Sequence, residues 1–142
     1  MKIVAAADHG GFEMKNQIVE DLRKQGFAVE DLGTNSADSV DYPDFAEKAT
    51  AKVLAGQADL GILVCGTGIG ISIAANRHKG IRAAILYDDY VAKVAREHNN
   101  AVLCFGGRTM TTEDVLRRIG IFLKAAYEGG RHDRRLCKLD LD

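Results

Sequence analysis

One stretch of the sequence combines a reactive side chain with a loop rich in backbone amides. The apolar run LGILV, residues 60–64, ends at Cys65, and glycine then occupies positions 66, 68 and 70. A short apolar run bounded by glycine is typical of a buried parallel strand. Alternating glycines allow sharp turns and a close approach of backbone N–H groups to a ligand. Residues 71–76 are typical of a helix, whose N-terminus stabilises negative charge at the same place.

A thiol beside the N-terminus of a helix is stabilised as the thiolate, which is the reactive form of cysteine. We therefore predict that Cys65 is a base or nucleophile next to an anion-binding loop. The hydrogen-bond donors expected around it are the hydroxyl of Thr67 and the backbone amides of Gly66, Thr67, Gly68, Ile69 and Gly70.

Two other interpretations of this stretch stay open. Free cysteines are usually buried core residues, which is the expectation for Cys104 and Cys137 and an alternative for Cys65. The glycine loop could instead be a dinucleotide fingerprint, with Asp88 about 20 residues further on as a ribose ligand. Against this, Ile71 occupies the place of the third glycine, and the loop follows the third expected strand. No spacing of histidine, cysteine and acidic residues predicts a metal site.

Strand-like and helix-like segments alternate along the chain. The expected strands are residues 2–7, 27–32, 60–64, 82–87 and 101–105. The expected helices are residues 12–25, 43–54 and 71–76, a fourth capped by Asp88 or Asp89, and a fifth from Thr111 or Thr112 to about Tyr127. This alternation predicts right-handed βαβ units. The expected fold is therefore a Rossmann-like, three-layer α/β/α sandwich around a five-stranded parallel sheet.

Three groups of polar residues follow strands and should meet at one edge of that sheet. Asp8 and His9 follow the first strand, the loop from Cys65 follows the third, and Arg108 follows the fifth. In open parallel sheets, ligands bind outside the carboxyl ends of the strands. Asp8 has a second possible role, because an aspartate at this position could cap the first helix.

Composition and charge narrow the class of protein. The chain has 142 residues, 46% of them hydrophobic and 27% charged, which suits one globular domain over residues 1–142 with a basic tail at 130–142. A formal net charge of -1 gives no general attraction to nucleic acid or to an anionic membrane. No apolar run approaches the roughly 20 residues of a membrane span, and no signal peptide is recognisable. Three widely spaced cysteines favour reduced thiols and a cytoplasmic location.

Several short motifs, taken together, resemble one family. They are Asp8-His9-Gly10-Gly11, Asp41-Tyr42-Pro43, Cys65-Gly66-Thr67-Gly68-Ile69-Gly70 with Ser72 and Ala74-Ala75-Asn76, His98-Asn99, Gly107-Arg108, and Tyr127-Glu128-Gly129-Gly130-Arg131-His132 with Arg135. In this order they resemble the family of ribose and galactose phosphate isomerases, of the ribose-5-phosphate isomerase B type. Each motif alone is weak, but the set covers nearly the whole chain and is specific.

The resemblance implies a metal-free and cofactor-free aldose–ketose isomerase that interconverts ribose 5-phosphate and ribulose 5-phosphate. It implies that Cys65 is the base that moves a proton between C1 and C2, and that His98 opens the sugar ring. Some members of the family place a glutamate base directly after the loop, where this chain has Ile71. The resemblance assigns substrate binding to Asp8, His9, Gly66, Thr67, Gly68, Ile69, Gly70, Asn99, Arg108, Arg131 and Arg135. A six-carbon sugar phosphate (allose 6-phosphate or galactose 6-phosphate) and a non-catalytic sugar-phosphate or nucleotide-binding module stay open as alternatives.

The order of the elements separates His98 from Cys65. His98 ends a helix that returns to the amino edge of the sheet, whereas Cys65 ends a strand at the carboxyl edge. The basic tail follows the fifth helix and should lie on the same side as His98. We therefore expect a homodimer, or a dimer of dimers, in which each active site takes residues from two subunits.

Overall fold

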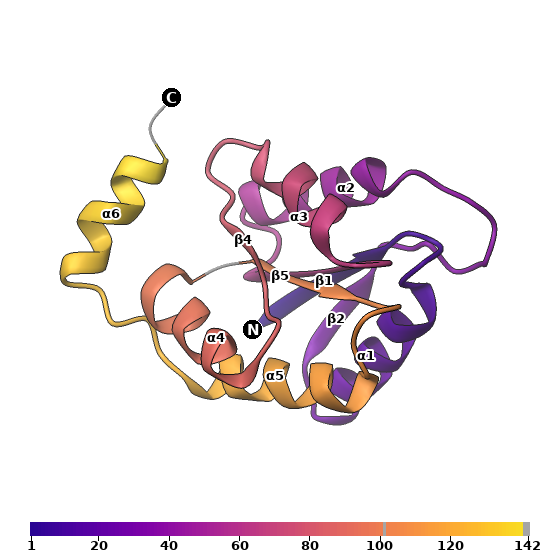
Figure 1. Ribbon diagram of the computed structural model, residues 1–142. Helices are drawn as coiled ribbons and strands as arrows, with labels where there is room; N and C mark the ends of the chain where they lie inside the picture. Colours follow the sequence, from indigo (N-terminus) through magenta and orange to yellow (C-terminus); the bar gives the residue numbers. More distant parts are fainter. Residues whose placement is uncertain (101, 141–142) are drawn as a thin grey trace.

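A computed structural model describes residues 1–100 and 102–140 as a five-stranded parallel sheet covered by helices on both faces (Figure 1). The sheet has the strand order β2-β1-β3-β5-β4. The strands are β1 (Lys2–Ala7), β2 (Ala28–Asp31), β3 (Leu60–Cys65), β4 (Ala83–Ile85) and β5 (Val102–Gly106). The helices are α1 (Phe12–Lys24), α2 (Tyr42–Leu54), α3 (Ile69–Asn76), α4 (Asp89–Val94), α5 (Thr112–Lys124) and α6 (Arg131–Leu139), and a π-helical turn, η1 (Ala95–Asn99), continues α4. The expected three-layer sandwich is confirmed.

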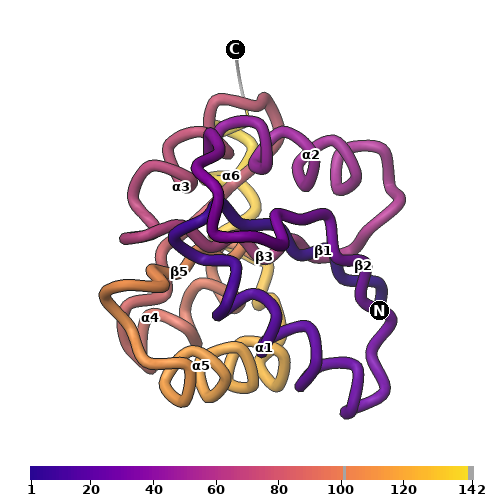
Figure 2. The backbone as a smooth tube through the Cα atoms, turned by 90° about the vertical axis from the view of Figure 1, so that its right-hand side faces the viewer, coloured from indigo at the N-terminus to yellow at the C-terminus, as the bar shows by residue number. Residues whose placement is uncertain are grey.

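The central strands are buried on both faces, which is why they are almost continuously apolar. Along β1, Ile3 and Ala5 contribute to the core that includes α1, α4 and α5, while Val4 and Ala6 contribute to the core that includes α2 and α3. Figure 2 shows the two helical layers on opposite sides of the sheet. Successive side chains of a strand point to opposite faces, so each residue of β1 has an apolar layer to pack against.

The strand order reverses between β1 and β3. From β1 the sheet continues to β2 in one direction, and from β3 it continues to β5 and β4 in the other. The loop after β1 leads into α1 on one face, while the loop after β3 leads into α3 on the other. Such a reversal leaves a crevice at the carboxyl edge, which is where sheets of this kind bind ligands.

Local signals fix several helix ends as expected. The side chain of Asp88 accepts a hydrogen bond from the N–H of Val91 (2.7 Å), and that of Thr111 accepts one from Asp114 (3.1 Å). Both are N-cap bonds that satisfy a free amide of the first turn. Gly26 has φ +94° just beyond α1, a conformation that favours glycine after a helix.

The C-terminal part differs from expectation. Helix α5 ends at Lys124 rather than near Tyr127, and the expected basic tail contains α6. Contacts with η1 explain the early end, because Arg96 donates to the carbonyl of Ala125 and the N–H of Glu128 donates to the carbonyl of Glu97 (2.9 Å). The expected start of β5 at residue 101 and the end of the tail at 141–142 lie outside the described residues.

Two glycine substitutions should have opposite effects on stability. A Cβ on Gly11 would lie 2.6 Å from the carbonyl oxygen of Val64, so Gly11→Ala should destabilise the protein by about 1–3 kcal/mol. Gly120 lies inside α5, and a Cβ there would meet no described atom within 4 Å. Gly120→Ala should therefore stabilise by about 0.5–1 kcal/mol through helix propensity. Urea unfolding of both variants measures this, and equal stabilities would contradict the close packing at Gly11.

Candidate active site

Cys65 is the last residue of β3, at the crevice between β1 and β3. It pairs with Gly106 of β5, and its side chain faces the layer formed by α2 and α3. Only 4% of its surface is exposed. The N–H of Gly68 donates to its Sγ at 3.2 Å. Gly68 has φ +82°, a conformation that is unfavourable for residues with a side chain. This conformation allows the loop to turn back toward the sulfur. The sulfur is therefore held in contact with the backbone of the glycine loop.

The glycine loop has already used two of its expected donors. The amide of Gly68 is bonded to the sulfur, and the amide of Ile69 donates to Oγ1 of Thr67 at 3.2 Å. The Thr67 oxygen is therefore an acceptor toward its own loop, and its O–H proton can point outward. Since Thr67 is exposed, this hydroxyl is a donor that a bound ligand can reach.

The loop after β1 lies directly against the glycine loop. A Cβ on Gly10 would lie 3.0 Å from the backbone nitrogen of Gly66, so the two backbones touch. Asp8 is 7% exposed and accepts a hydrogen bond from the N–H of Gly10 at 2.9 Å. Its carboxylate therefore shapes this loop, whereas helix α1 begins after Gly11 without a side-chain cap.

His9 adjoins a cavity of about 500 Å³. Residues 39–44, Asp8 and His9 line it. The N–H of Val40 donates to Nδ1 of His9 at 3.2 Å, which assigns the proton of the neutral ring to Nε2. His9 thus offers a ligand an N–H donor.

A buried lysine supports the segment that contacts His9, and nothing in the sequence pattern indicated it. Lys15 of α1 is completely buried, and its Nζ lies 2.6 Å from Asp31 Oδ1 and 2.6 Å from Asn35 Oδ1. The bonds connect α1, β2 and the start of the loop that leads to Val40. A buried ammonium with two anchoring oxygens is satisfied, so Lys15 has a structural role.

Arg108 brings positive charge to the same edge. Its N–H donates to the carbonyl of Gly66 at 2.9 Å, and the N–H of Gly107 donates to that of Cys65 at 2.8 Å. The guanidinium lies over the glycine loop, because a Cβ on Gly66 would be 3.3 Å from its Nη1. Arg108 is exposed, and its guanidinium can bind an anion through two parallel N–H donors, that is, in a bidentate manner.

The other predicted site residues lie at the opposite edge. His98 and Asn99 end η1, just before β5 begins, whereas Cys65 is paired with the last residue of β5. Helix α6, which carries Arg131 and Arg135, packs beside η1, far from the glycine loop (Figure 1). One chain therefore brings together Asp8, His9, the glycine loop and Arg108, and separately places His98, Asn99 and the basic residues of α6.

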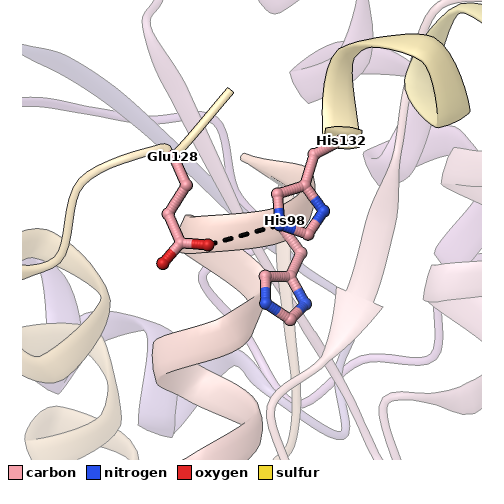
Figure 3. Close-up of side chains that lie close together, drawn as sticks. All are labelled: His98, Glu128 and His132. Carbon is pink, nitrogen blue, oxygen red and sulfur yellow. Dashed lines mark hydrogen bonds and ion pairs between the residues drawn. The ribbon is translucent and has the colours of Figure 1, made fainter. Parts of the chain in front are cut away.

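A cluster at this second edge was not expected from the sequence. The rings of His98 and His132 stack with centroids 4.2 Å apart and planes at 19°, and His132 Nε2 lies 3.3 Å from Oε1 of Glu128 (Figure 3). A hydrogen bond of 2.6 Å from the Tyr127 hydroxyl to Asp133 fixes the start of α6 and raises the pKa of Tyr127 to about 12. The one signal in the sequence for this contact was the four-residue spacing of Glu128 and His132, which places two side chains on the same side of a helical turn.

The three thiols should differ in reactivity toward iodoacetamide. Cys137 was expected to be a core cysteine, which is wrong: it is exposed on α6, a helix that buries only His132, and it should react first. Cys65 should follow, since its sulfur has a hydrogen-bond donor and a slightly exposed surface. Burial raises the pKa of Cys104, which should react only when the protein unfolds. Peptide mapping by mass spectrometry gives the order, with denatured protein as the control. Fast labelling of Cys104 in the folded protein would contradict this burial.

Fold and site together define a class: a doubly wound, Rossmann-like α/β protein with a thiol and a glycine-rich loop at its topological switch point. The family model for Ribose/Galactose Isomerase matches residues 3–139, and the chain belongs to this family of sugar-phosphate isomerases. The chain is 45% identical over 136 residues to ribose-5-phosphate isomerase B of Escherichia coli K12, covering 95% of this chain and 91% of that one.

Solved structures agree with this assignment. Ribose-5-phosphate isomerase B of Clostridium thermocellum superposes with a TM-score of 0.97 at 46% identity, covering 99% of this chain and 95% of that one. The enzyme of Mycoplasma genitalium, solved with bound ribulose 5-phosphate, has a TM-score of 0.93 at 45% identity, covering 98% and 93%. Among the described residues, no helix has the length and hydropathy needed to cross a bilayer.

Proposed function

We propose that this chain interconverts D-ribose 5-phosphate and D-ribulose 5-phosphate through an enediolate intermediate. The observation that carries the proposal is the sulfur of Cys65, held at the switch point with the Gly68 amide directed at it. The names of the relatives, which are ribose-5-phosphate isomerases at about 45% identity, support the same substrate.

In the proposed reaction, the Cys65 thiolate removes the proton from C2 of the open-chain aldose. The electrons form the C1–C2 double bond of the enediolate, and negative charge develops on the C1 oxygen. The Thr67 hydroxyl donates to that oxyanion, a contribution of about 3 kcal/mol for one well-placed donor. The hydroxyl proton on the C2 oxygen passes to the C1 oxygen as the carbonyl forms at C2, and the thiol returns its proton to C1. The thiolate is thereby regenerated and no cofactor is consumed.

The remaining residues are proposed to prepare and hold the substrate. His98 opens the furanose ring by moving a proton to the ring oxygen, a task that suits an imidazole near neutral pH. The phosphate and hydroxyl groups bind to the arginines and to the polar residues of the two edges. We assign this binding to Asp8, His9, Gly66, Thr67, Gly68, Ile69, Gly70, Asn99, Arg108, Arg131 and Arg135.

The proposed roles of His98 and Cys65 require two subunits, because within one chain the two residues lie at opposite edges of the sheet. We propose a homodimer in which His98 of one subunit completes the site of Cys65 in the other. Exposed apolar residues beside the glycine loop support a partner there: Ile69 is 55%, Ile73 54% and Tyr87 64% exposed. Ile69 and Tyr87 line a cavity of about 510 Å³ together with Thr67. A partner that buried these side chains would also enclose the substrate.

A six-carbon substrate is the second candidate, since the matching family includes galactose isomerases. One extra carbon in a pocket is worth only about 1–3 kcal/mol, so related sugars compete closely.

We also propose a cytoplasmic location for this protein, because its three free thiols fit a reducing compartment.

Ketose formation from ribose 5-phosphate, allose 6-phosphate and galactose 6-phosphate tests the proposal. We expect the largest kcat/KM for ribose 5-phosphate, unchanged after dialysis against EDTA. A larger value for a six-carbon phosphate would overturn the substrate assignment. Binding of these sugars without ketose formation would instead indicate a non-catalytic module.

A further inference from the structure

The cluster at the amino edge of the sheet has the composition of a metal site. His98 comes from η1, His132 from α6, and Glu128 from the segment between α5 and α6 (Figure 3). The donor atoms of these three side chains all lie within 4.8 Å of one another. Two imidazole nitrogens and one carboxylate oxygen are a ligand set that binds Zn²⁺ and related divalent transition-metal ions.

The distances within the cluster approach those of a tetrahedral site. Zinc bonds of about 2.0–2.1 Å place neighbouring ligand atoms about 3.4 Å apart. His132 Nε2 and Glu128 Oε1 are already 3.3 Å apart. The ring of His98 offers the third donor within 4.8 Å, and binding an ion requires that this side chain rotate out of the stack so that a nitrogen lone pair points at the metal.

Surrounding contacts hold two of these ligands in place. His132 is 4% exposed, and its backbone N–H donates to the carbonyl of Gly129 at 3.1 Å. The N–H of Glu128 donates to the carbonyl of Glu97 at 2.9 Å, which ties the carboxylate to the turn that carries His98. Because two of the three ligands are already held in place, metal binding has to order only the side chain of His98.

We propose that His98, Glu128 and His132 bind one Zn²⁺ per chain, with the fourth coordination position open to water. The ion takes the place of the hydrogen between His132 Nε2 and Glu128 Oε1, and it is also coordinated by a ring nitrogen of His98. Zn²⁺ is therefore an inhibitor of this isomerase, a consequence that rests on the ring-opening role proposed for His98. Mg²⁺ and Ca²⁺ should bind far more weakly, because they prefer an all-oxygen shell.

Competition with a chromophoric chelator measures the Zn²⁺ affinity of the apoprotein. We expect one tight site per chain in the unmodified protein and at least about a 100-fold loss of affinity in His132→Gln and Glu128→Gln. His78→Gln is the matched control, since His78 lies outside the cluster, and it should bind like the unmodified protein. Circular dichroism and thermal unfolding show that each variant is folded. Unchanged affinity in folded His132→Gln and Glu128→Gln would overturn the site.

Cobalt substitution separates this site from a thiol site. Co²⁺ bound to nitrogen and oxygen should lack the sulfur-to-cobalt charge-transfer band that Cys65 or Cys137 would produce. A charge-transfer band that disappears in Cys65→Ala or Cys137→Ala would overturn the assignment. Zn²⁺ should also abolish isomerase activity, and EDTA should restore it. Zn²⁺ binding that depends on His132 but leaves the isomerase active would uphold the metal site and refute the ring-opening role of His98.

Discussion

Replacing Cys65 by alanine should lower kcat for ribose 5-phosphate about 10²–10⁴-fold, the usual contribution of a positioned general base. The substitution removes the only group in the glycine loop proposed to take a proton from carbon. Binding of the sugar phosphate should persist, because the arginines and the loop amides remain. KM should therefore change much less than kcat, which steady-state kinetics measures directly.

Two further variants sharpen this test. Cys65→Ser should be nearly as inactive as Cys65→Ala, since a hydroxyl is a much weaker acid than a thiol and supplies almost no anion at neutral pH. Cys137→Ala is the matched control, because that thiol is exposed on α6 and outside the proposed machinery, and it should retain full activity. A Cys65→Ala enzyme that kept a tenth or more of the original kcat would refute Cys65 as the base.

Coexpression of Cys65→Ala and His98→Ala chains should restore activity that neither variant has alone. In a shared-site dimer, a heterodimer has one site with both native residues and one with neither. Random assortment makes half of the dimers mixed, so the population should regain about a quarter of the native activity. The measurement is the specific activity of the copurified mixture.

The control pairs Cys65→Ala with a Cys65→Ala/His98→Ala chain, which restores no complete site and should stay inactive. Two different affinity tags on the chains establish that heterodimers are present. Inactive heterodimers, isolated through both tags, would show that the two residues do not meet across a subunit boundary.

Much of the fold could be predicted because its elements depend on local patterns. The apolar runs of β1 and β3, the cap residues Asp88 and Thr111, and Gly26 beyond α1 all take the expected roles. Those features involve residues close in sequence, whose preferences the tertiary structure reinforces. The parallel order of the strands then brings the ends of β1, β3 and β5 to one edge.

Helix α6 was missed because little of it is apolar. Its two leucines are not fully buried, with Leu139 63% exposed, and its one buried residue is His132. Hydrophobic periodicity, the main signal for a helix, is therefore weak there. In the same region, α5 stops early because bonds to η1 compete with continued helix, and those bonds join residues about 30 positions apart.

Residue order and periodicity were enough to predict the sandwich, the placement of Cys65 at the end of a buried strand, and the separation of His98 from it, since all three follow from the succession of elements. The folded chain was needed to show which loop amides are already bonded, that Lys15 is buried and bonded to the loop that leads to Val40, and that His98, Glu128 and His132 meet. These features depend on side-chain directions and on contacts between distant segments, which no local pattern in a single chain records.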